Sequence, residues 1–538
     1  MSKLRVAKLG LITALGGILS LTTQVVLASP KVFTESIVPV PDDIRVVGTP
    51  SSDAPVEFQV ALKMRNFANL EKRIAAGETI SSTQLVANYY PLESDYQSLL
   101  QWLTAKGLTI EQTFPNHLSV VVSGTVATVQ QAMGVEFATV NVNSKAYVAA
   151  STAPKLPDDI AQFVLGINGL QPYLQAYPHH IVRESYLPGF RPQTSQPPYL
   201  VDEIKSAYNA TGLNVDGTGE KIAILIDRFP NDRDLTQFWS DNSVSQSLSN
   251  IEKVAVVNNI PTTPDVEESL DVEWSSSIAP GSKVRIYATG NLTFVNIDKG
   301  FQKLIADLSN QPTLHQLSIS LGACEAQISS SQKQTDSQFL ATIASKKVTI
   351  FVSSGDSGSK GNCSSGKGVE YLASDPNVTA VGGTSLDAPL PGVIDSETAW
   401  SGSGGGISSF FNRPSFQVGP GVPSGKLRLV PDVALEADPN TGVYLVVNGV
   451  IDIVGGTSFS APAWAGFNAL INQGRVDRQK PPLGLLGPRI YRLLKTSSFR
   501  DITSGNNGDF SAQPGYDQVT GIGVPRVNTL LRTLVKQP

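Results

Sequence analysis

Hydrophobic and polar positions divide most of the chain into two folded stretches. Between Phe58 and Leu174, short apolar runs alternate with longer mixed segments. The runs at 117–123 and 137–142 predict strands, and the segments at 95–106 and 125–133 predict helices. Helices and strands that alternate on this scale predict a small α+β domain.

A proline-rich segment follows this predicted domain. Residues 178–200 hold five prolines with Arg, Gln and Ser between them. Such sequence buries little apolar surface and predicts an exposed linker. Exposed linkers are where proteases cut, so a maturation cleavage is expected here.

The larger stretch, 201–538, opens its sheet pattern with Lys221–Ile226, a continuously apolar run. Runs of this kind are typical of parallel strands buried on both faces. Five later runs repeat the theme: Lys253–Val257, Lys283–Tyr287, Leu317–Ser320, Thr349–Ser353 and Val378–Val381. With helical stretches between them they predict a doubly wound α/β sheet, whose active groups tend to follow the carboxyl ends of strands.

Composition limits the kind of protein. The 538 residues are only 16% charged and carry a net charge of -5, which argues against a nucleic-acid or anionic-membrane partner. Basic residues at Lys3, Arg5 and Lys8 precede an apolar run at 9–21, and small residues end at Ala28. This pattern predicts a signal peptide cleaved after Ala28. A single membrane anchor is the alternative, but the run is short for a span of about 20 residues.

The chain has two cysteines, Cys324 and Cys363. In the oxidising compartment that an export signal implies, one disulfide is the simplest arrangement, and two buried thiols are the alternative.

The segment Gly455–Pro462 (GGTSFSAP) holds the candidate nucleophile. Its glycines permit a tight turn without a Cβ clash. Ser458 would then stand before the helix predicted at 463–472, where free N–H groups and the positive dipole end lie near a reacting atom. Alone, such a turn is more often a simple helix cap.

A serine nucleophile needs a base, and histidine is the usual one. Of the four histidines, His117, His179 and His180 lie in the N-terminal stretch or the linker. His315 stands before a buried-type strand without the glycine-rich neighbours of a catalytic histidine. A Ser-His-Asp triad in the larger stretch is therefore poorly supported.

Carboxylates are the alternative base. Glu267 and Asp271 are four residues apart, so they share one face of a helix beside an apolar stripe that includes Trp274. Two like charges this close resist ionising together and share a proton. The pair could accept the Ser458 proton, with Asp271 orienting Glu267. An acidic, solvated helix face is the other interpretation.

Two further segments carry candidate chemistry. Asp356 follows the predicted strand at 349–353, where a protonated carboxyl can donate to an oxyanion and so ties activity to acidic pH. An ordinary turn explains the same residue without chemistry. Asp501 and Asp517 bracket a loop rich in Gly and Asn, which can supply the oxygens that Ca²⁺ prefers, although a polar loop without metal gives the same pattern.

Together these motifs resemble the sedolisin–kumamolisin family of serine-carboxyl peptidases, which also includes tripeptidyl-peptidases. The resemblance covers nearly all of the chain after the first 28 residues. Glu267 and Asp271 match the family's ExxxD motif. Residues 456–458 match its nucleophile motif, with Gly455 in place of the leading Ser, and 355–358 match its GDSG oxyanion motif.

The resemblance implies a subtilisin-like doubly wound catalytic domain preceded by a ferredoxin-like α+β propeptide. The expected organisation is a signal peptide at 1–28, an activation propeptide at 29–177, the linker with its maturation cleavage at 178–200, and a peptidase domain at 201–538.

The resemblance also implies roles for the motif residues. Ser458 attacks the peptide carbonyl, Glu267 takes the proton and Asp271 holds Glu267, while protonated Asp356 stabilises the oxyanion. It implies one structural calcium ion, held by the side chains of Asp501 and Asp517 and the carbonyls of Ile502, Gln513 and Gly515.

The expected protein is a secreted, acid-acting endopeptidase that processes itself, acts on polypeptides as a monomer and is inhibited by its own propeptide. Neither nucleic acid nor a membrane is an expected partner. Three alternatives remain open: a neutral subtilisin-like protease that uses His315, a catalytically silent binding protein on the same scaffold, and a tripeptidyl-peptidase.

Overall fold

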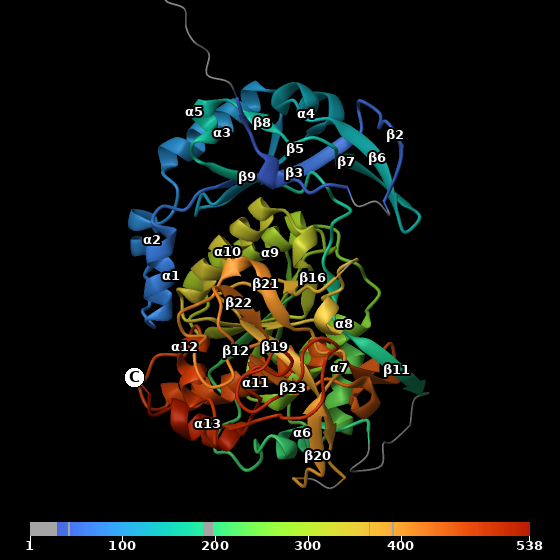
Figure 1. Ribbon diagram of the computed structural model, residues 1–538, viewed down its shortest axis with the longest axis vertical. Coiled ribbons are helices and arrows are strands. Elements are labelled where there is room, and N and C mark those ends of the chain that lie inside the picture. Colours follow the sequence, from blue (N-terminus) through green and yellow to red (C-terminus); the bar gives the residue numbers. More distant parts are fainter. Residues whose placement is uncertain (1–29, 41–43, 187–196, 365, 390–391, 538) are drawn as a thin grey trace, which may run out of the picture.

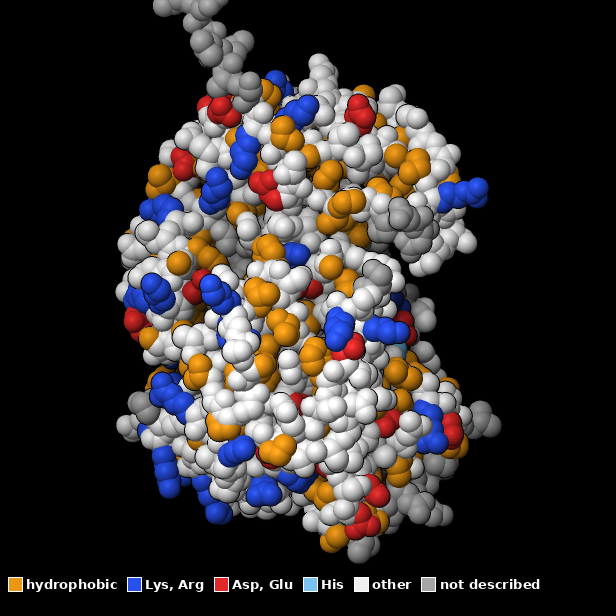
Figure 2. Space-filling model, viewed as in Figure 1, with side chains coloured by type: hydrophobic (Ala, Val, Ile, Leu, Met, Phe, Trp, Pro, Cys, Tyr) orange, Lys and Arg blue, Asp and Glu red, His pale blue; other side chains and the backbone are white. Residues whose placement is uncertain are grey.

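The computed structural model describes residues 30–40, 44–186, 197–364, 366–389 and 392–537. The predicted signal peptide lies outside these residues. Figure 1 shows two lobes, the smaller one, in blue and teal, above the larger C-terminal one. In Figure 2 the lobes meet over a broad waist, with an indentation between them on the right of the view. Within the described part of the chain, no helix combines the length and apolarity needed to cross a bilayer.

The N-terminal lobe is the predicted α+β unit. Its four-stranded antiparallel sheet runs in the order β4 (Thr109–Thr113), β5 (Ser119–Thr125), β3 (Pro55–Leu62) and β9 (Val164–Asn168). The helices α3 (Glu93–Ala105) and α4 (Val126–Met133) share the sheet's buried apolar core. The predicted strand at 137–142 is β6 (Phe137–Val142), which pairs antiparallel with β7 (Lys145–Ala150) and with β2 (Arg45–Gly48).

The other face of this sheet rests on two helices of the C-terminal lobe, α9 (Phe294–Asp307) and α10 (Ser330–Ala344) (Figure 1). The contact includes buried polar groups: the Gln302 amide donates to Ser119 Oγ at 2.9 Å, and Asn168 bonds Ser331 and Thr335 at 2.6 and 2.9 Å. Buried polar groups with specific partners fix how two surfaces register. The N-terminal lobe therefore docks in one defined position.

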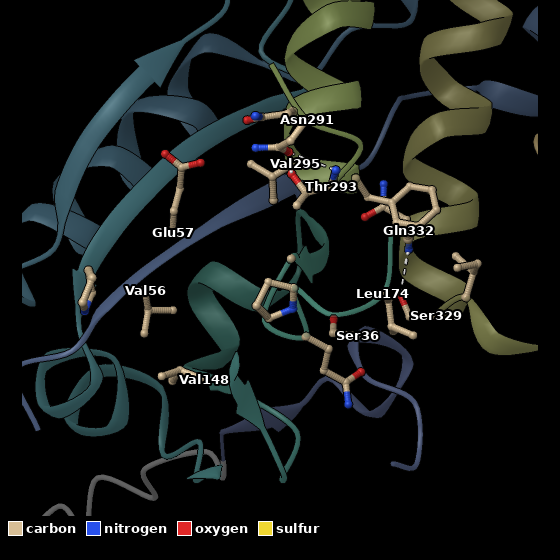
Figure 3. A pocket seen from close by; sticks show the side chains of 17 residues that line it. Ser36, Val56, Glu57, Val148, Leu174, Asn291, Thr293, Val295, Ser329 and Gln332 are labelled. Carbon is tan, nitrogen blue, oxygen red and sulfur yellow. Dashed lines mark hydrogen bonds between the residues drawn. The ribbon is translucent and has the colours of Figure 1, made fainter. Parts of the chain in front are cut away.

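A cavity of about 290 Å³ remains at this interface (Figure 3). It lies between β3 and the starts of α9 and α10, with Val56 and Glu57 on one side and Asn291 and Gln332 on the other. None of the candidate catalytic residues lines it.

The C-terminal lobe is built on the predicted parallel sheet. Six parallel strands run in the order β13 (Ile251–Ala255), β14 (Lys283–Ala288), β12 (Lys221–Ile226), β15 (Leu314–Ile319), β17 (Thr349–Ser353) and β19 (Thr379–Asp387). β23 (Val433–Glu436) pairs parallel with β19, and β20 (Ser396–Ala399) antiparallel. Helices α8 (Val266–Ile278) and α11 (Thr457–Val476) pack together against the sheet, while α9 and α10 cover its other face. This is the expected doubly wound, subtilisin-like α/β fold.

The remaining described elements complete the lobes. The other helices are α1 (Phe67–Ala75), α2 (Ser82–Asn88), α5 (Asp158–Ala161), α6 (Val201–Ala207), α7 (Asp232–Asp241), α12 (Gly487–Ile490) and α13 (Val527–Leu534). The other strands are β1 (Lys31–Val32), β8 (Lys155–Leu156), β10 (Tyr177–Pro178), β11 (Ile181–Tyr186), β16 (Leu321–Cys324), β18 (Glu370–Tyr371), β21 (Gly406–Asn412), β22 (Leu427–Val430), β24 (Val443–Val447), β25 (Val450–Gly455), β26 (Phe499–Arg500) and β27 (Val524–Pro525).

The segment predicted as an exposed linker, 178–200, is exposed over 181–185, but its first part forms paired strands. β10 pairs antiparallel with β16, and β11 pairs antiparallel with β25. The two partner strands supply the hydrogen bonds that this polar segment cannot supply by itself, so it is ordered. Residues 187–196 lie outside the described part of the chain.

Candidate active site

The candidate nucleophile sits where β25 turns into α11. Gly456 has φ 114°, in the region that favours glycine, and a Cβ there would lie 2.3 Å from the carbonyl oxygen of His179. Ser458 follows in the first turn of α11, fully buried. The helix thus starts earlier than the predicted 463–472, and the backbone N–H of Ser458, in its first turn, has no acceptor within the helix.

The nucleophile's hydroxyl lies among backbone groups rather than side chains. Ser458 Oγ accepts the His179 backbone N–H at 2.9 Å and lies 3.4 Å from the Ser320 carbonyl oxygen. Pro462 has no N–H for the Ser458 carbonyl, and the Ser320 hydroxyl lies 3.3 Å from that oxygen instead. Ser320 thus lies against the nucleophile from the end of β15.

Both carboxylates of the predicted pair lie on α8, as expected, but the helix is not a solvated acidic face. Glu267 is 3% exposed and Asp271 is fully buried. Trp274, on the same helix, packs edge-on against Phe459 of α11 with ring centres 4.7 Å apart, which fixes the two helices together.

Asp271 is held by Ser320, a residue that the sequence did not indicate for this purpose. The Ser320 hydroxyl donates to Asp271 Oδ1 at 2.6 Å. Burial, and then the nearby charge of Glu267, raise the pKa of Asp271 well above its usual range, while the Ser320 bond opposes the rise. Asp271 is therefore the member of the pair that retains a proton more readily than a free aspartate.

Asp356 follows β17, as predicted, and faces the nucleophile turn. Its Oδ1 accepts the backbone N–H and the hydroxyl of Thr457 at 2.8 and 2.9 Å. Its Oδ2 has no hydrogen-bond partner among the described residues, and a Cβ on Gly456 would lie 2.5 Å from it. Burial raises the pKa of Asp356 to about 7. At acidic pH this oxygen carries a proton and can donate beside the His179 carbonyl.

The chain's own linker lies beside Ser458 in the manner of a peptide substrate. It occupies the cleft, the space bordered by β16, β25 and the Ser458 turn. The His179 backbone N–H lies 3.3 Å from the Ser320 carbonyl oxygen, continuing the pairing of β10 with β16. The His179 carbonyl accepts the Ser458 backbone N–H at 2.9 Å. The peptide bond between His179 and His180 is therefore the one presented to Ser458.

The two linker histidines also fill the site with their side chains. His179 Nδ1 lies 2.7 Å from Ser353 Oγ, and His180 Nδ1 lies 2.6 Å from Glu267 Oε2. Burial lowers the pKa of His180, but the hydrogen bond to Glu267 and its charge outweigh burial and raise the pKa. Sequence reasoning set these histidines aside as linker residues. The sequence feature that could have pointed to them is the pair of adjacent histidines directly before the apolar residues Ile181 and Val182.

His315 lies at the opposite edge of the sheet. It stands near the start of β15 and bonds Glu220, just before β12, through Nδ1 at 2.9 Å. Ser320 and Asp356 follow the carboxyl ends of parallel strands, about 17 Å away along a six-residue strand. The structure thus contradicts His315 as the base for Ser458.

A disulfide joins the walls of the cleft. Cys324 and Cys363 are bonded, which confirms the predicted pairing. Cys324 also stands opposite Glu370 in the β16–β18 pairing. The disulfide therefore ties the loop after Asp356 to the strand that binds the linker.

The predicted calcium ligands converge in the described structure. Asp501 follows β26, and its Oδ2 accepts the Gly515 N–H at 2.8 Å. Asp517 is fully buried, and burial raises its pKa to about 6. Among the described residues, no hydrogen bond ends on the carbonyl oxygens of Ile502, Gln513 or Gly515. Two carboxylates and three free carbonyls form a donor set that suits Ca²⁺.

Comparison with known proteins matches both lobes. Residues 42–173 match the family model of the pro-kumamolisin activation domain, and residues 206–498 match the subtilase family. Kumamolisin from Bacillus sp. (strain MN-32) is 32% identical over 513 residues, covering 90% of this chain and 89% of that protein. Sedolisin from Pseudomonas sp. (strain 101) is 26% identical, covering 86% and 84%. Human tripeptidyl-peptidase 1 is 32% identical over 370 residues, covering 62% and 63%.

A solved structure agrees with the fold. Pseudomonas sedolisin, a serine-carboxyl proteinase complexed with pseudo-iodotyrostatin, superposes with a TM-score of 0.55 at 25% identity, covering 63% of this chain and 98% of that one. The fold and these matches define a serine-type peptidase preceded by an activation domain. The chain belongs to the sedolisin–kumamolisin family of serine-carboxyl peptidases.

Proposed function

We propose that this chain is a secreted, acid-acting serine endopeptidase, made as a zymogen that first cuts its own linker between His179 and His180. One observation carries the proposal: the His179 carbonyl accepts the Ser458 N–H while both flanking strands of the linker are paired within the cleft. A bond held in this way is cleaved in a unimolecular step, with the entropy of association already lost.

The chemistry follows from the groups around that bond. Ser458 Oγ attacks the His179 carbonyl carbon, and Glu267 takes the hydroxyl proton and then delivers it to the His180 amine. Asp271 orients Glu267, and the two carboxyl groups share one proton. The Ser458 N–H and the protonated Asp356 Oδ2 receive the oxyanion. Water then releases His179 from Ser458 by the reverse sequence.

The continuous path of the linker supports an endopeptidase rather than a tripeptidyl-peptidase. The chain enters through β10 and leaves through β11, with the whole activation domain on the acyl side. The cleft therefore accommodates a polypeptide that extends in both directions. A tripeptidyl-peptidase needs the acyl side closed after three residues.

We also propose one structural calcium ion in the loops around Asp501 and Asp517. Their carboxylates, with the free carbonyls of Ile502, Gln513 and Gly515, would hold it, and the ion would fasten the C-terminal loops to the sheet. The ion takes no part in the proposed reaction.

Secretion rests on the sequence of the first 28 residues and on the Cys324–Cys363 disulfide, which belongs to oxidising compartments. A proprotein exported from a bacterial host should begin at Ser29. An N-terminus at Met1 on the exported protein would contradict the predicted signal peptide.

The decisive experiment is an acid shift of the purified proprotein beside Ser458→Ala, followed by intact mass and by digestion of an unfolded protein. We expect wild type to yield a chain that begins at His180 and then digests the substrate, while Ser458→Ala stays full length. The variant His315→Gln should process like wild type, because His315 lies at the far edge of the sheet. If wild type stays intact and inert at every pH, the chain is a binding protein on a peptidase scaffold and the proposal is wrong.

A further inference from the structure

The side chain before the cut bond occupies a pocket that matches its chemistry. The His179 side chain is 1% exposed and lies among Ser353, Gly322 and Glu370. We propose that this peptidase prefers histidine, in its cationic form, on the acyl side of the bond it cuts, and that Ser353 and Glu370 select it. This inference rests on the proposed function and names its substrate class.

Shape is the first part of the argument. A Cβ on Gly322 would lie 2.5 Å from His179 Cε1 and 2.8 Å from Nε2, so that wall touches the ring itself. A Cβ on Gly355 would lie 2.4 Å from Glu370 Cγ, so only glycine at this position leaves room for the Glu370 side chain beside the His179 ring. The ring of Tyr177 meets the imidazole edge-on, with centres 5.3 Å apart. The pocket is bounded closely around an imidazole.

Hydrogen bonding is the second part. Ser353 Oγ lies 2.7 Å from Nδ1, and Glu370 Oε2 lies 3.8 Å from Nε2. At 3.8 Å this contact is an ion pair rather than a hydrogen bond, and neither Nε2 nor Oε2 has a hydrogen-bond partner among the residues that the structure describes. A cationic imidazole donates from both nitrogens, whereas a neutral one donates from only one. A neutral ring protonated at Nε2 also matches both groups, because the Ser353 hydroxyl can then donate to Nδ1. The hydrogen-bonding groups therefore select an imidazole, and the buried Glu370 carboxylate beside Nε2 selects its cationic form.

Charge is the third part. Glu370 is fully buried, and its other oxygen accepts the Tyr177 hydroxyl at 2.6 Å. A buried carboxylate without a cation is costly, and the structure pairs this one with the ligand's own ring. Burial lowers the pKa of His179, but Glu370, with the further charges of Asp356 and Glu267, outweighs burial and raises it. The acidic range that protonates Asp356 therefore also keeps the histidine charged.

The preference is measurable on peptides that copy the linker, Tyr-Pro-X-His-Ile-Val. The enzyme is obtained by acid processing of the full-length proprotein. With X as His, Phe or Gln at pH 4.5, we expect kcat/KM for His to exceed the others by about 100-fold, as in sites whose buried polar groups need a partner. The ratio of His to Gln should fall as pH rises toward 8, since the ring loses its charge. Equal or faster cleavage with Phe by wild type would overturn the proposal.

Variants locate the preference. Glu370→Gln and Ser353→Ala should each lower the ratio of His to Phe by at least tenfold. The matched control Glu436→Gln, which alters a buried carboxyl outside the cleft, should keep the ratio. An unchanged ratio in Glu370→Gln overturns the role of this residue. If Glu370→Gln does not fold, Ser353→Ala and the wild-type peptide series still decide.

The outcome for the preference is separable from that for the proposed function. If wild type digests an unfolded protein in a Ser458-dependent manner at bonds without a histidine bias, only the preference is wrong. If it digests nothing and leaves its linker intact, the proposed function is wrong as well.

Discussion

Asp356 offers the sharpest test of the proposed chemistry, because its two oxygens lie in different surroundings. Oδ1 is fixed by the backbone N–H and hydroxyl of Thr457, at 2.8 and 2.9 Å. Oδ2 has no partner among the described residues and lies beside Gly456, next to the His179 carbonyl. Oδ2 can help an oxyanion only while it carries a proton.

The size and the pH dependence follow from this geometry. Removing one oxyanion donor costs roughly 100- to 1000-fold in turnover, about 2.7–4 kcal/mol of barrier. Burial raises the pKa of Asp356 to about 7, so the donor is present below that pH and is lost above it. Wild-type self-processing should therefore slow about tenfold for each pH unit above 7 from this group alone. Asp356→Ala should be slower than wild type by 100- to 1000-fold at pH 4 to 5.

Asp356→Asn separates the donor from its titration. Because the two Thr457 donors hold an acceptor at Oδ1, the amide nitrogen takes the place of Oδ2 and donates at every pH. We expect Asp356→Asn to process within about tenfold of wild type in acid and to lack the decline of the aspartate above pH 7.

The assay is the first-order loss of full-length chain after a pH jump, followed by gel between pH 3 and 9. Asp375→Asn is the matched control, since Asp375 is also fully buried with a raised pKa but lies outside the cleft. Asp356 is not the oxyanion donor if Asp356→Ala processes within threefold of wild type at each pH, or if Asp356→Asn retains the wild-type decline.

Three further predictions test the fold around the site. Gly456→Ala should abolish processing while circular dichroism stays native, because its Cβ would overlap the His179 carbonyl at 2.3 Å; an active variant contradicts this. Replacing Cys324 and Cys363 by Ser removes a cross-link between residues that are 39 apart in the sequence. The denaturant midpoint of unfolding should fall by the equivalent of about 4 kcal/mol, and an unchanged midpoint would refute a stabilising role of the disulfide. Chelator should lower the melting temperature of wild type but not of Asp517→Asn, and equal responses would exclude the calcium site.

The sequence predicted the parts of the fold that depend on local pattern. Lys221–Ile226 is a strand with the predicted bounds, because strands buried on both faces are continuous apolar runs. The spacing of Glu267 and Asp271 placed them together on α8 because helical geometry is local. What lay outside local pattern was the burial of α8 on all sides, which follows from its packing against α11.

The linker shows where a single sequence stops being informative. Its prolines and polar residues predict no structure by themselves, and its order comes from β16 and β25, which lie far along the chain. The start of α11 was missed for a related reason. Pro462 favours a helix that begins after it, yet α11 begins at Thr457, whose N–H is accepted by Asp356 from the loop after β17. Both corrections depend on partners that no sequence window contains.

On the proposed mechanism, the acid trigger requires no prior movement of the activation domain. The linker already lies in the cleft with its His179 carbonyl on the Ser458 N–H, so position does not limit the first cut. Above about pH 7 the limit is the protonation of Asp356, because a carboxylate beside that carbonyl opposes the negative charge of the oxyanion. Acid supplies the missing proton, and the cut then frees the activation domain from its covalent tether. Slow cleavage above pH 7 and faster cleavage below it thus follow from one bound geometry in two protonation states of Asp356.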